Sequence, residues 1–325
     1  MPKKNNRMKL LNVTAILFAL LFINRVFAQD SIVTPPKNWK ISNVFGFNAT
    51  QSAFVNWAAG GRNNVSALAF VNSNFDYAKN SSKWTNEVRL ALGGVQYFDE
   101  PRMQKTDDQL FLGSNYAYKI REKWYFSVLA DFRTQFLDGY IFPNDSVPNS
   151  RFMAPGYSIL ALGVNFTPNE HFTVLMAPAT GKFTFVNDQR LANEGAFGVR
   201  AAELDGLGNV IRQGDRFRAE LGAYIRVLYK KEIMKNILLQ SRLELFSNYL
   251  EKPQNIDVNA EVLFNFKINS WFSATLQLNL LYDDDMRVAV SDGAGGTYMA
   301  PRTQFKQVLG LGIQYRLANF KEEKK

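Results

Sequence analysis

The amino-acid sequence predicts an all-β fold, a transmembrane antiparallel β-barrel of about twelve strands with short periplasmic turns and longer extracellular loops. Apolar residues recur with period two along most of the chain after Trp39, as in strands with one apolar face. Many of these segments exceed the ~5–6 residues of a typical strand and reach the ~9–11 that a tilted strand needs to cross a bilayer. No helical stripe of comparable strength is present. A single barrel therefore accounts for most of the chain.

Residues 1–28 have the three parts of a secretory signal peptide. Four basic side chains come first: Lys3, Lys4, Arg7 and Lys9. The apolar run 10–23 follows, which is shorter than the ~20 residues of a spanning helix, and Ala28 completes a cleavage site. Met8 is an alternative start. We expect the mature chain to begin with a short periplasmic lead, residues 29–38.

The charge balance changes once the signal peptide is removed. The chain has 38 Lys and Arg against 29 Asp and Glu, a formal net charge of +9. Five of the basic residues, the four above and Arg25, lie in the signal, which leaves 33 against 29 and a net charge of +4. Nucleic-acid binding therefore loses its main electrostatic support. With no Cys and one His, thiolate and multi-histidine metal sites are excluded, and no cofactor is expected.

The alternating segments give the expected strands in order. They lie at residues 39–49, 64–78, 83–96, 108–120, 123–136, 156–167, 171–186, 215–230, 235–250, 254–268, 271–283 and 302–318. The last segment alternates most clearly. One of its faces carries Phe305, Leu309, Leu311, Ile313, Tyr315 and Leu317, and the other carries Lys306, Gly310, Gly312, Gln314 and Arg316. A different division of 171–186 or 235–268 would change the number of strands to ten or fourteen.

The connections and the strand ends favour a barrel in a membrane over a soluble sandwich. The short turns lie at 79–82, 121–122, 168–170, 231–234 and 269–270, and the long segments between them at 50–63, 97–107, 137–155, 187–214 and 284–301. Only 251–253 breaks this rhythm. Aromatic side chains collect at strand ends, where interface girdles occur: Trp39, Trp84, Trp124, Tyr125, Tyr249, Trp271, Phe272 and Tyr282.

The end of the chain supports outer-membrane targeting. Gly312, Tyr315 and Leu317 stand at the glycine, aromatic and apolar positions of the C-terminal signal that barrel-insertion machinery reads. Phe320 closes the barrel region and a charged tail, 321–325, follows. We therefore expect export to the outer membrane and a barrel over 39–320. The expected partners are outer-membrane lipid and the insertion machinery.

A motif in the first long loop resembles a known family. Residues 51–64 (QSAFVNWAAGGRNN) are similar to the opening motif of a Bacteroidota outer-membrane family catalogued as domain of unknown function 3078, as is the layout of signal, short lead and barrel. The resemblance implies location and architecture but no activity. The motif's candidates for anchoring the loop or contacting a ligand are Asn56, Trp57, Gly60, Gly61 and Arg62. The two glycines permit a tight reversal, and the Trp can pack the loop against the barrel mouth.

Candidates for chemistry on the surface are few. A surface lipid hydrolase needs a Ser–His pair, but His171, the single His, follows a short turn on the periplasmic side, so an enzyme is not expected. Asp283, Asp284 and Asp285 end a strand at the outer rim and are weak candidates for Ca²⁺ or Mg²⁺ ligands, since a solvated loop explains them as well.

The inward faces of the strands carry charges of both signs. The lumen-facing candidates are Glu87, Arg89, Asp131, Arg133, Arg216, Arg218, Glu220, Arg226, Arg242, Glu244, Glu261 and Arg316, with Lys267 and Lys306 in addition. These groups either line a water-filled passage or pair across the lumen and close it. The leading hypothesis is therefore passage or binding of a small polar solute through the lumen. The alternative is a structural or assembly-partner barrel that docks another envelope protein.

Overall fold

A computed structural model describes residues 38–54, 61–291 and 296–320. Twelve long strands form a closed barrel in the order β1-β16-β13-β12-β11-β10-β7-β6-β5-β4-β3-β2. Every neighbouring pair is antiparallel, including β1 with β16, which closes the barrel. The predicted fold class and its approximate strand number are thus confirmed. The predicted signal peptide, almost all of the lead and the charged tail lie outside the described residues.

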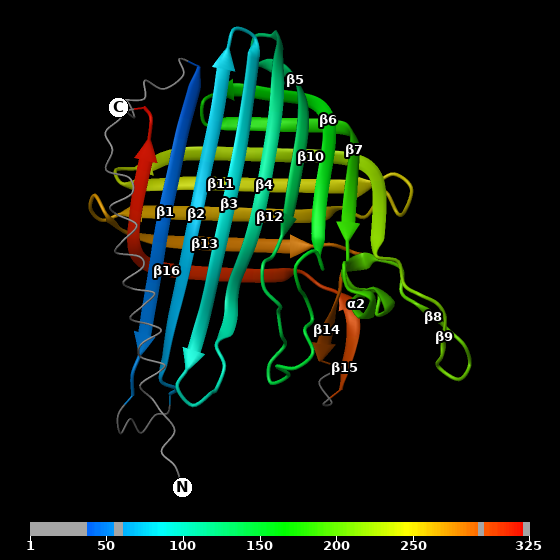
Figure 1. Ribbon diagram of the computed structural model, residues 1–325. Coiled ribbons are helices and arrows are strands. Elements are labelled where there is room, and N and C mark those ends of the chain that lie inside the picture. Colours follow the sequence, from blue (N-terminus) through cyan, green and yellow to red (C-terminus); the bar gives the residue numbers. More distant parts are fainter. Residues whose placement is uncertain (1–37, 55–60, 292–295, 321–325) are drawn as a thin grey trace. The chain divides into compact units, whose positions relative to one another are not determined.

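The barrel strands agree closely with the expected segments. They are β1 (Trp39–Ser52), β2 (Asn64–Lys79), β3 (Ser82–Tyr97), β4 (Gln104–Arg121), β5 (Trp124–Thr134), β6 (Gly156–Asn169), β7 (Phe172–Phe185), β10 (Phe217–Met234), β11 (Ile237–Asn248), β12 (Asp257–Lys267), β13 (Phe272–Tyr282) and β16 (Gln304–Ala318). Figure 1 shows β1 to β7 running steeply, while β10 to β13 and β16 cross behind them.

Two boundaries correct the sequence prediction. The segment 231–234, expected as a turn, is the end of β10, and the chain reverses at 235–236 instead. Asn236 has φ 67°, a left-handed conformation that Asn tolerates in tight hairpin turns, so the turn forms there. Gln104 begins β4 inside the segment expected as a long loop. Strand pairing needs only backbone groups, and it therefore continues past the end of the alternating pattern.

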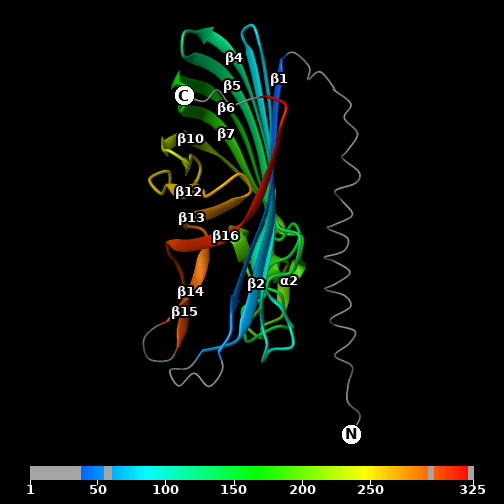
Figure 2. The same cartoon turned by 90° about the vertical axis from the view of Figure 1, so that its left-hand side faces the viewer.

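The long loops contain structure that periodicity did not predict. Two hairpins, β8 (Glu203–Leu204) with β9 (Val210–Arg212) and β14 (Arg287–Ser291) with β15 (Thr297–Pro301), lie outside the barrel wall. A short helix α2 (Gln189–Asn193) and a 3₁₀ turn η2 (Ala196–Gly198) precede β8. Figure 2 shows them at the loop end of the barrel. Buried apolar residues hold this region together: Ala154, Val186, Leu191, Ala192 and Val199.

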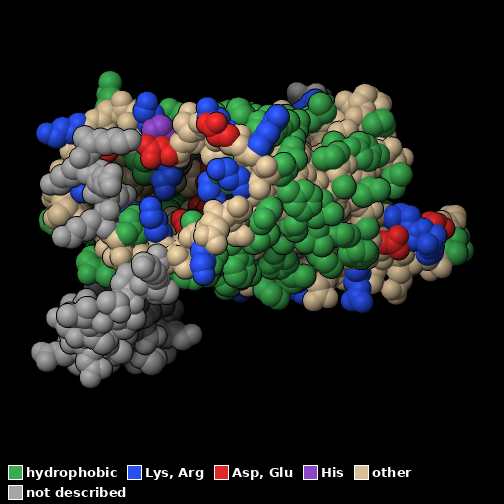
Figure 3. All heavy atoms as spheres, turned by 90° about the horizontal axis from the view of Figure 1, so that it is seen from above, with side chains coloured by type: hydrophobic (Ala, Val, Ile, Leu, Met, Phe, Trp, Pro, Cys, Tyr) green, Lys and Arg blue, Asp and Glu red, His purple; other side chains and the backbone are tan. Residues whose placement is uncertain are grey.

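The outer wall of the barrel is apolar. The predicted faces of the last strand are correct, because Phe305, Leu309 and Tyr315 are 64%, 66% and 65% exposed and point away from the lumen. Green hydrophobic side chains cover much of the barrel wall in Figure 3. Among the described residues, no helix is long and apolar enough to cross a membrane.

Part of the interior is packed rather than open. Apolar side chains from β5, β6, β7, β10 and β11 form a buried cluster of Leu129, Ala161, Leu175, Ala177, Tyr224 and Phe246. These strands are neighbours in the closed order, so the cluster fills one side of the lumen. The charged side chains of the interior occupy other inward-facing positions of the barrel strands.

Candidate functional site: charged layers in the barrel interior

A layer of paired charges crosses the middle of the lumen. We call it the mid-lumen belt and define it by four bases and four acids: Arg89, Arg133, Arg226, Arg242, Glu87, Asp131, Glu244 and Glu261. All eight were among the lumen-facing candidates. They come from β3, β5, β10, β11 and β12, and the strict alternation of each strand points them inward. The belt is electrically neutral as a set.

The belt joins opposite walls of the barrel. Arg242 on β11 pairs with Glu87 on β3, and these strands lie on opposite sides of the closed order. Arg89 Nη1 lies 2.8 Å from Glu261 Oε2 on β12.

Shared carboxylates extend the belt into a chain. Glu87 also lies 3.2 Å from Arg89. Glu244 accepts from Arg133 at 2.8 Å and lies 3.7 Å from Arg242. Arg226 pairs separately with Asp131, at 3.1 Å. A continuous chain of alternating charges therefore runs from wall to wall.

An aromatic ring supports three of the guanidinium groups. Phe111 on β4 is 1% exposed, and its ring centroid lies 4.3 Å from Arg89, 5.0 Å from Arg242 and 5.7 Å from Arg133. Gly113, two residues on, leaves room: a Cβ there would lie 3.0 Å from both Asp131 Oδ1 and the Phe111 ring. The ring provides a cation–π surface that holds the charges at one level.

The belt is not fully hydrogen-bonded. Asp131 Oδ1, Arg226 Nε, Arg242 Nη1 and Glu244 Oε1 are buried and have no hydrogen-bond partner within the protein. In a low-dielectric interior, a paired charge is stabilised by its partner, whereas an unpaired one costs several kcal/mol. The belt thus joins the walls of the barrel by ion pairs and keeps spare donors and acceptors.

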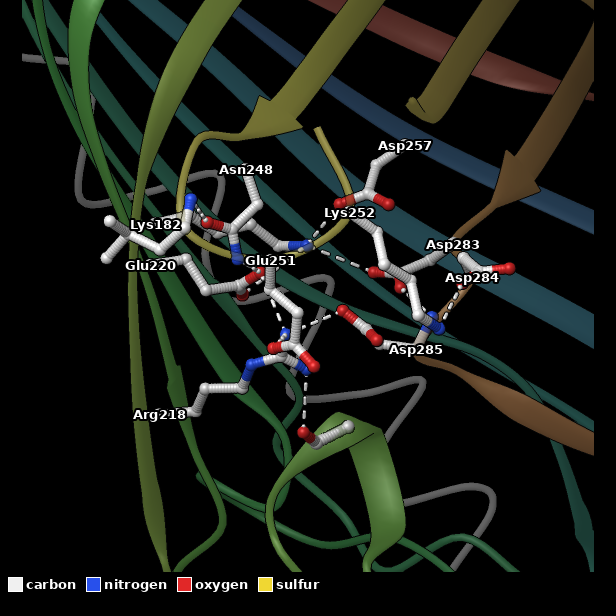
Figure 4. Close-up of polar contacts among 12 residues, drawn as sticks. Lys182, Arg218, Glu220, Asn248, Glu251, Lys252, Asp257, Asp283, Asp284 and Asp285 are labelled. Carbon is white, nitrogen blue, oxygen red and sulfur yellow. Dashed lines mark hydrogen bonds and ion pairs between the residues drawn. The ribbon is translucent and has the colours of Figure 1, made fainter. Parts of the chain in front are cut away.

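A second charged layer lies at the loop end. We call it the loop-side cluster: Lys182, Arg218, Glu220, Glu251, Lys252, Asp257, Asp283, Asp284 and Asp285 (Figure 4). Lys182 Nζ on β7 lies 2.6 Å from Asp257, 3.0 Å from Asp283 and 3.8 Å from Glu220. Its side chain is only 13% exposed. The cluster ties β7, β10, β12 and the end of β13 together, with acids in excess.

Arg218 fastens a loop to this cluster. Its Nη2 lies 2.6 Å from Asp285 and 3.2 Å from Glu220, and its Nη1 donates to the carbonyl of Gly198 in η2 at 2.8 Å. The loop that carries α2 and η2 is therefore held over this end of the barrel. Figure 4 shows the Arg218 side chain between the strand wall and that loop.

The three consecutive aspartates reach three different cations. Asp283 contacts Lys182, Asp284 lies 3.3 Å from Lys252, and Asp285 contacts Arg218. Among the described residues, no group of three or more His, Cys, Asp or Glu side chains has an arrangement that could hold a metal ion. In the structure each of the three carboxylates forms an ion pair.

A cavity lies on the other side of the belt. It has a volume of about 190 Å³, and its inner wall includes Glu87, Asp131, Arg226 and Arg242. Toward the short turns it is lined by Lys83, Thr85, Asn115, Tyr125, Thr167 and Thr173. Lys83 Nζ lies 4.4 Å from the centroid of the Tyr125 ring. The cavity ends at the belt.

The opening motif of the family resemblance is seen only in part. Asn56, Trp57 and Gly60 lie outside the described residues. Gly61 has φ 143°, and a Cβ there would lie 2.7 Å from the Phe54 ring, so both conformation and space favour glycine.

Arg62 joins two loops. It lies 2.9 Å from Asp99 and 2.6 Å from Glu100, and its guanidinium stacks 4.1 Å from the Tyr97 ring. Its hydrogen bonds lower the pKa of both the Asp99 and the Glu100 carboxyl. These contacts anchor the first long loop to the second.

The remaining predicted residues lie apart from the belt. Arg216 is exposed and precedes β10, and Arg316 Nε donates to Ser42 Oγ at 3.1 Å near the short-turn end. Lys306 lies 2.8 Å from Asp107. His171 Nδ1 lies 3.1 Å from the Lys230 carbonyl oxygen.

Sequence reasoning missed Phe111 and Lys182. The alternation of the strands could have identified both. Phe111 lies two residues from Gln109, and Lys182 lies two residues from Thr184, so each points into the lumen with its polar neighbour.

Comparisons with known proteins agree with the predicted family over part of the chain. The model of the family described as protein of unknown function (DUF3078) matches residues 49–140, which include the opening motif and β2 to β5. No curated protein matches the chain.

Solved barrels resemble it at low identity. An outer membrane channel from Pseudomonas putida F1 is 13% identical, with 87% of this chain and 96% of that chain covered and a TM-score of 0.38. The NanC porin is 8% identical, with 84% and 98% covered and a TM-score of 0.36. The translocator domain of the autotransporter NalP from Neisseria meningitidis is also 8% identical, with 94% and 98% covered and a TM-score of 0.30.

Proposed function

We propose that this chain is an outer-membrane β-barrel through which a small polar solute passes, and that the mid-lumen belt is its gate. The membrane location is supported by the apolar outer wall and by barrel closure, which leaves no unpaired strand edge in lipid. The predicted signal peptide and C-terminal signal support export to the outer membrane. Aromatic contacts near strand ends, such as Trp39 with Trp84 at 5.9 Å, suit an interface girdle.

The main support for a gate is that arginines of the belt each have two carboxylates within reach. Arg242 has both Glu87 and Glu244 within reach, and Arg89 has both Glu87 and Glu261. An arginine that releases one carboxylate therefore still has another. Exchange of this kind opens a path without leaving a buried charge unpaired, which would cost ~3–5 kcal/mol. A neutral, exchangeable layer thus differs from a permanent plug.

Conductance in planar bilayers tests the gate. We expect the wild-type barrel to be closed most of the time, because its walls are joined through the belt. Glu87→Gln and Arg242→Met should raise the open fraction about tenfold or more, since each removes one wall-to-wall pair. Arg200→Met, which breaks the exposed pair with Asp215 at 2.7 Å in the loops, is the matched control and should behave as wild type.

A structural barrel is the second candidate, and the buried apolar cluster around Leu129 and Tyr224 favours it, because packed side chains narrow the lumen. Under this alternative, the belt variants would remain closed and would transport no solute into liposomes. Such a result, together with a co-purifying envelope protein, would reject the gate.

A further inference from the structure

The short-turn end of the lumen carries a surplus of cations. The strand register places six basic side chains and two acidic ones on the inward rows near this end: Lys40, Lys83, Lys119, Lys230, Lys267, Arg316, Asp76 and Glu232. The five lysines are exposed. Lys and Arg side chains, with fewer acidic ones, border a hollow at one end of the barrel in Figure 3. Such a ring attracts anions toward the lumen and repels cations.

The cavity lies directly behind this ring. Its volume of about 190 Å³ limits an occupant to a small organic molecule. Hydroxyl and amide groups from inward rows line it, among them Thr85, Asn115 and Thr167. These groups both donate and accept hydrogen bonds. The lining therefore suits a solute that carries hydroxyl groups.

Lys83 is the cation in this cavity that is free for a ligand. It contacts the Tyr125 ring, and no ion pair from Lys83 to a carboxylate occurs within the described parts of the chain. The two arginines of the cavity wall, Arg226 and Arg242, are each paired with an acid of the belt. Counting these residues with Glu87 and Asp131, the cavity has one positive charge more than negative.

The inner wall of the cavity carries buried polar atoms that have no hydrogen-bond partner in the described part of the protein. Asp131 is 3% exposed and its Oδ1 has no hydrogen-bond partner, and Arg226, 7% exposed, has an unpartnered Nε. Both residues line the cavity. An occupant could therefore contact the unpartnered atoms of Asp131 and Arg226 at the belt and the ammonium group of Lys83 at the short-turn end.

We infer that this cavity binds a small hydroxylated carboxylate that enters from the short-turn side, with its carboxylate on Lys83 and its hydroxyl groups toward Thr85, Asn115 and the belt. The inference rests on the proposed function, because it names the solute class that waits at the gate. Binding itself does not require the gate to open. The two proposals can therefore fail separately.

Ligand binding to the detergent-solubilised full barrel tests the inference. D-glycerate and glycerol are a matched pair of probes, since they differ in one carboxylate, and saturation-transfer NMR measures both. We expect glycerate to bind at least about tenfold more tightly than glycerol, the effect of one charge-assisted hydrogen bond. Lys83→Gln should remove that preference. Lys231→Gln, at an exposed position outside the cavity lining, should retain it.

The controls separate the proposal from loss of the fold. Thr85→Val should weaken glycerate binding severalfold while retaining Lys83, and heat-modifiable migration in gels reports that each variant is folded. Equal binding of the two probes, binding of neither, or an unchanged preference in folded Lys83→Gln would each overturn the inference. A closed barrel that binds glycerate but never conducts would overturn only the gate.

Discussion

The two ends of the lumen use charge in opposite ways. At the loop end, Lys182 is largely buried and contacts Asp257, Asp283 and Glu220. At the short-turn end, Lys83 is exposed and rests on the Tyr125 ring. Both are lysines on inward rows of barrel strands. The role of each lysine is therefore set by the acidic side chains that the closed strand order brings to it.

The same contrast separates stability from binding. A buried charge that has lost its partner destabilises the fold, whereas an exposed one changes stability little. The belt and the loop-side cluster should therefore dominate the free energy of unfolding. The basic side chains at the short-turn end of the lumen should dominate interactions with solutes.

The largest effect is expected at the centre of the belt. Glu244 is 4% exposed and accepts from both Arg133 and Asn259 at 2.8 Å. Glu244→Gln should lower the free energy of unfolding by ~3–5 kcal/mol, because it leaves Arg133 without its charged partner. Urea unfolding in detergent micelles, followed by tryptophan fluorescence, measures this loss.

Glu251→Gln is the matched control for that change. Glu251 is 60% exposed and lies 3.3 Å from Arg218, so its removal should cost less than ~1 kcal/mol. A loss at Glu244 no larger than at Glu251 would show that the belt does not stabilise the barrel.

The next effect compares the two lysines directly. Lys182→Met should destabilise the barrel by ~2–4 kcal/mol, because three carboxylates then face one another without their shared cation. Lys83→Met should change the free energy of unfolding by less than ~0.5 kcal/mol, as exposed surface substitutions do. Urea unfolding of both variants under the same conditions gives the difference. Similar losses would refute the division between the two ends.

The sequence was sufficient to predict which side chains point into the lumen, but not which of them form ion pairs with one another. Alternation alone places Phe305 and Leu309 outside and Arg242 and Glu244 inside, because side chains of a strand point to opposite faces regardless of its neighbours. The pairing of Glu87 with Arg242 depends on β3 and β11 lying opposite each other after closure. That arrangement follows from strand order and tilt, which no local pattern records.

Two residues show how the remaining features escaped prediction. Phe111 is apolar on an inward row, and a single such residue resembles ordinary variation in the alternation. Lys182 follows Gly181 in a segment whose acidic partners come from β12 and from the end of β13. Its role therefore becomes visible only when distant strands are brought together. The hairpins in the long loops, such as β8 with β9, are too short to give a periodic signal.

A smaller effect is expected at the aromatic support of the belt. Phe111→Leu keeps an apolar side chain but removes the ring that faces Arg89, Arg242 and Arg133. We expect a loss of ~1–3 kcal/mol in the free energy of unfolding, from cation–π contacts worth ~0.5–1 kcal/mol each and a small packing change. Leu129→Met, in the neighbouring apolar cluster, is a control for packing alone and should cost less than ~1.5 kcal/mol. Equal losses in the two variants would show that the ring acts only by filling space.

The smallest effect is expected at the loop anchor formed by Arg62 of the opening motif, which lies in a loop and not in the lumen. Arg62 lowers the pKa of Asp99 and Glu100, so its contribution is present above the ordinary carboxyl pKa and is lost as the pH falls through the lowered values. The Phe98 amide, which donates to the Asn63 carbonyl at 3.0 Å, reports locally on this anchor. Its protection factor in hydrogen exchange should be constant from pH 7 to about 5 and fall modestly below about pH 4.

Arg62→Met is the control that assigns this pH dependence. It should give low protection of the Phe98 amide at every pH, because no guanidinium then joins the two loops. High salt should also weaken the wild-type effect, since the ion pairs are exposed and are screened. A variant whose protection falls with pH as in the wild type would place the titrating groups elsewhere. The anchor would then owe its order to the Gly61 backbone and the Phe54 contact rather than to charge.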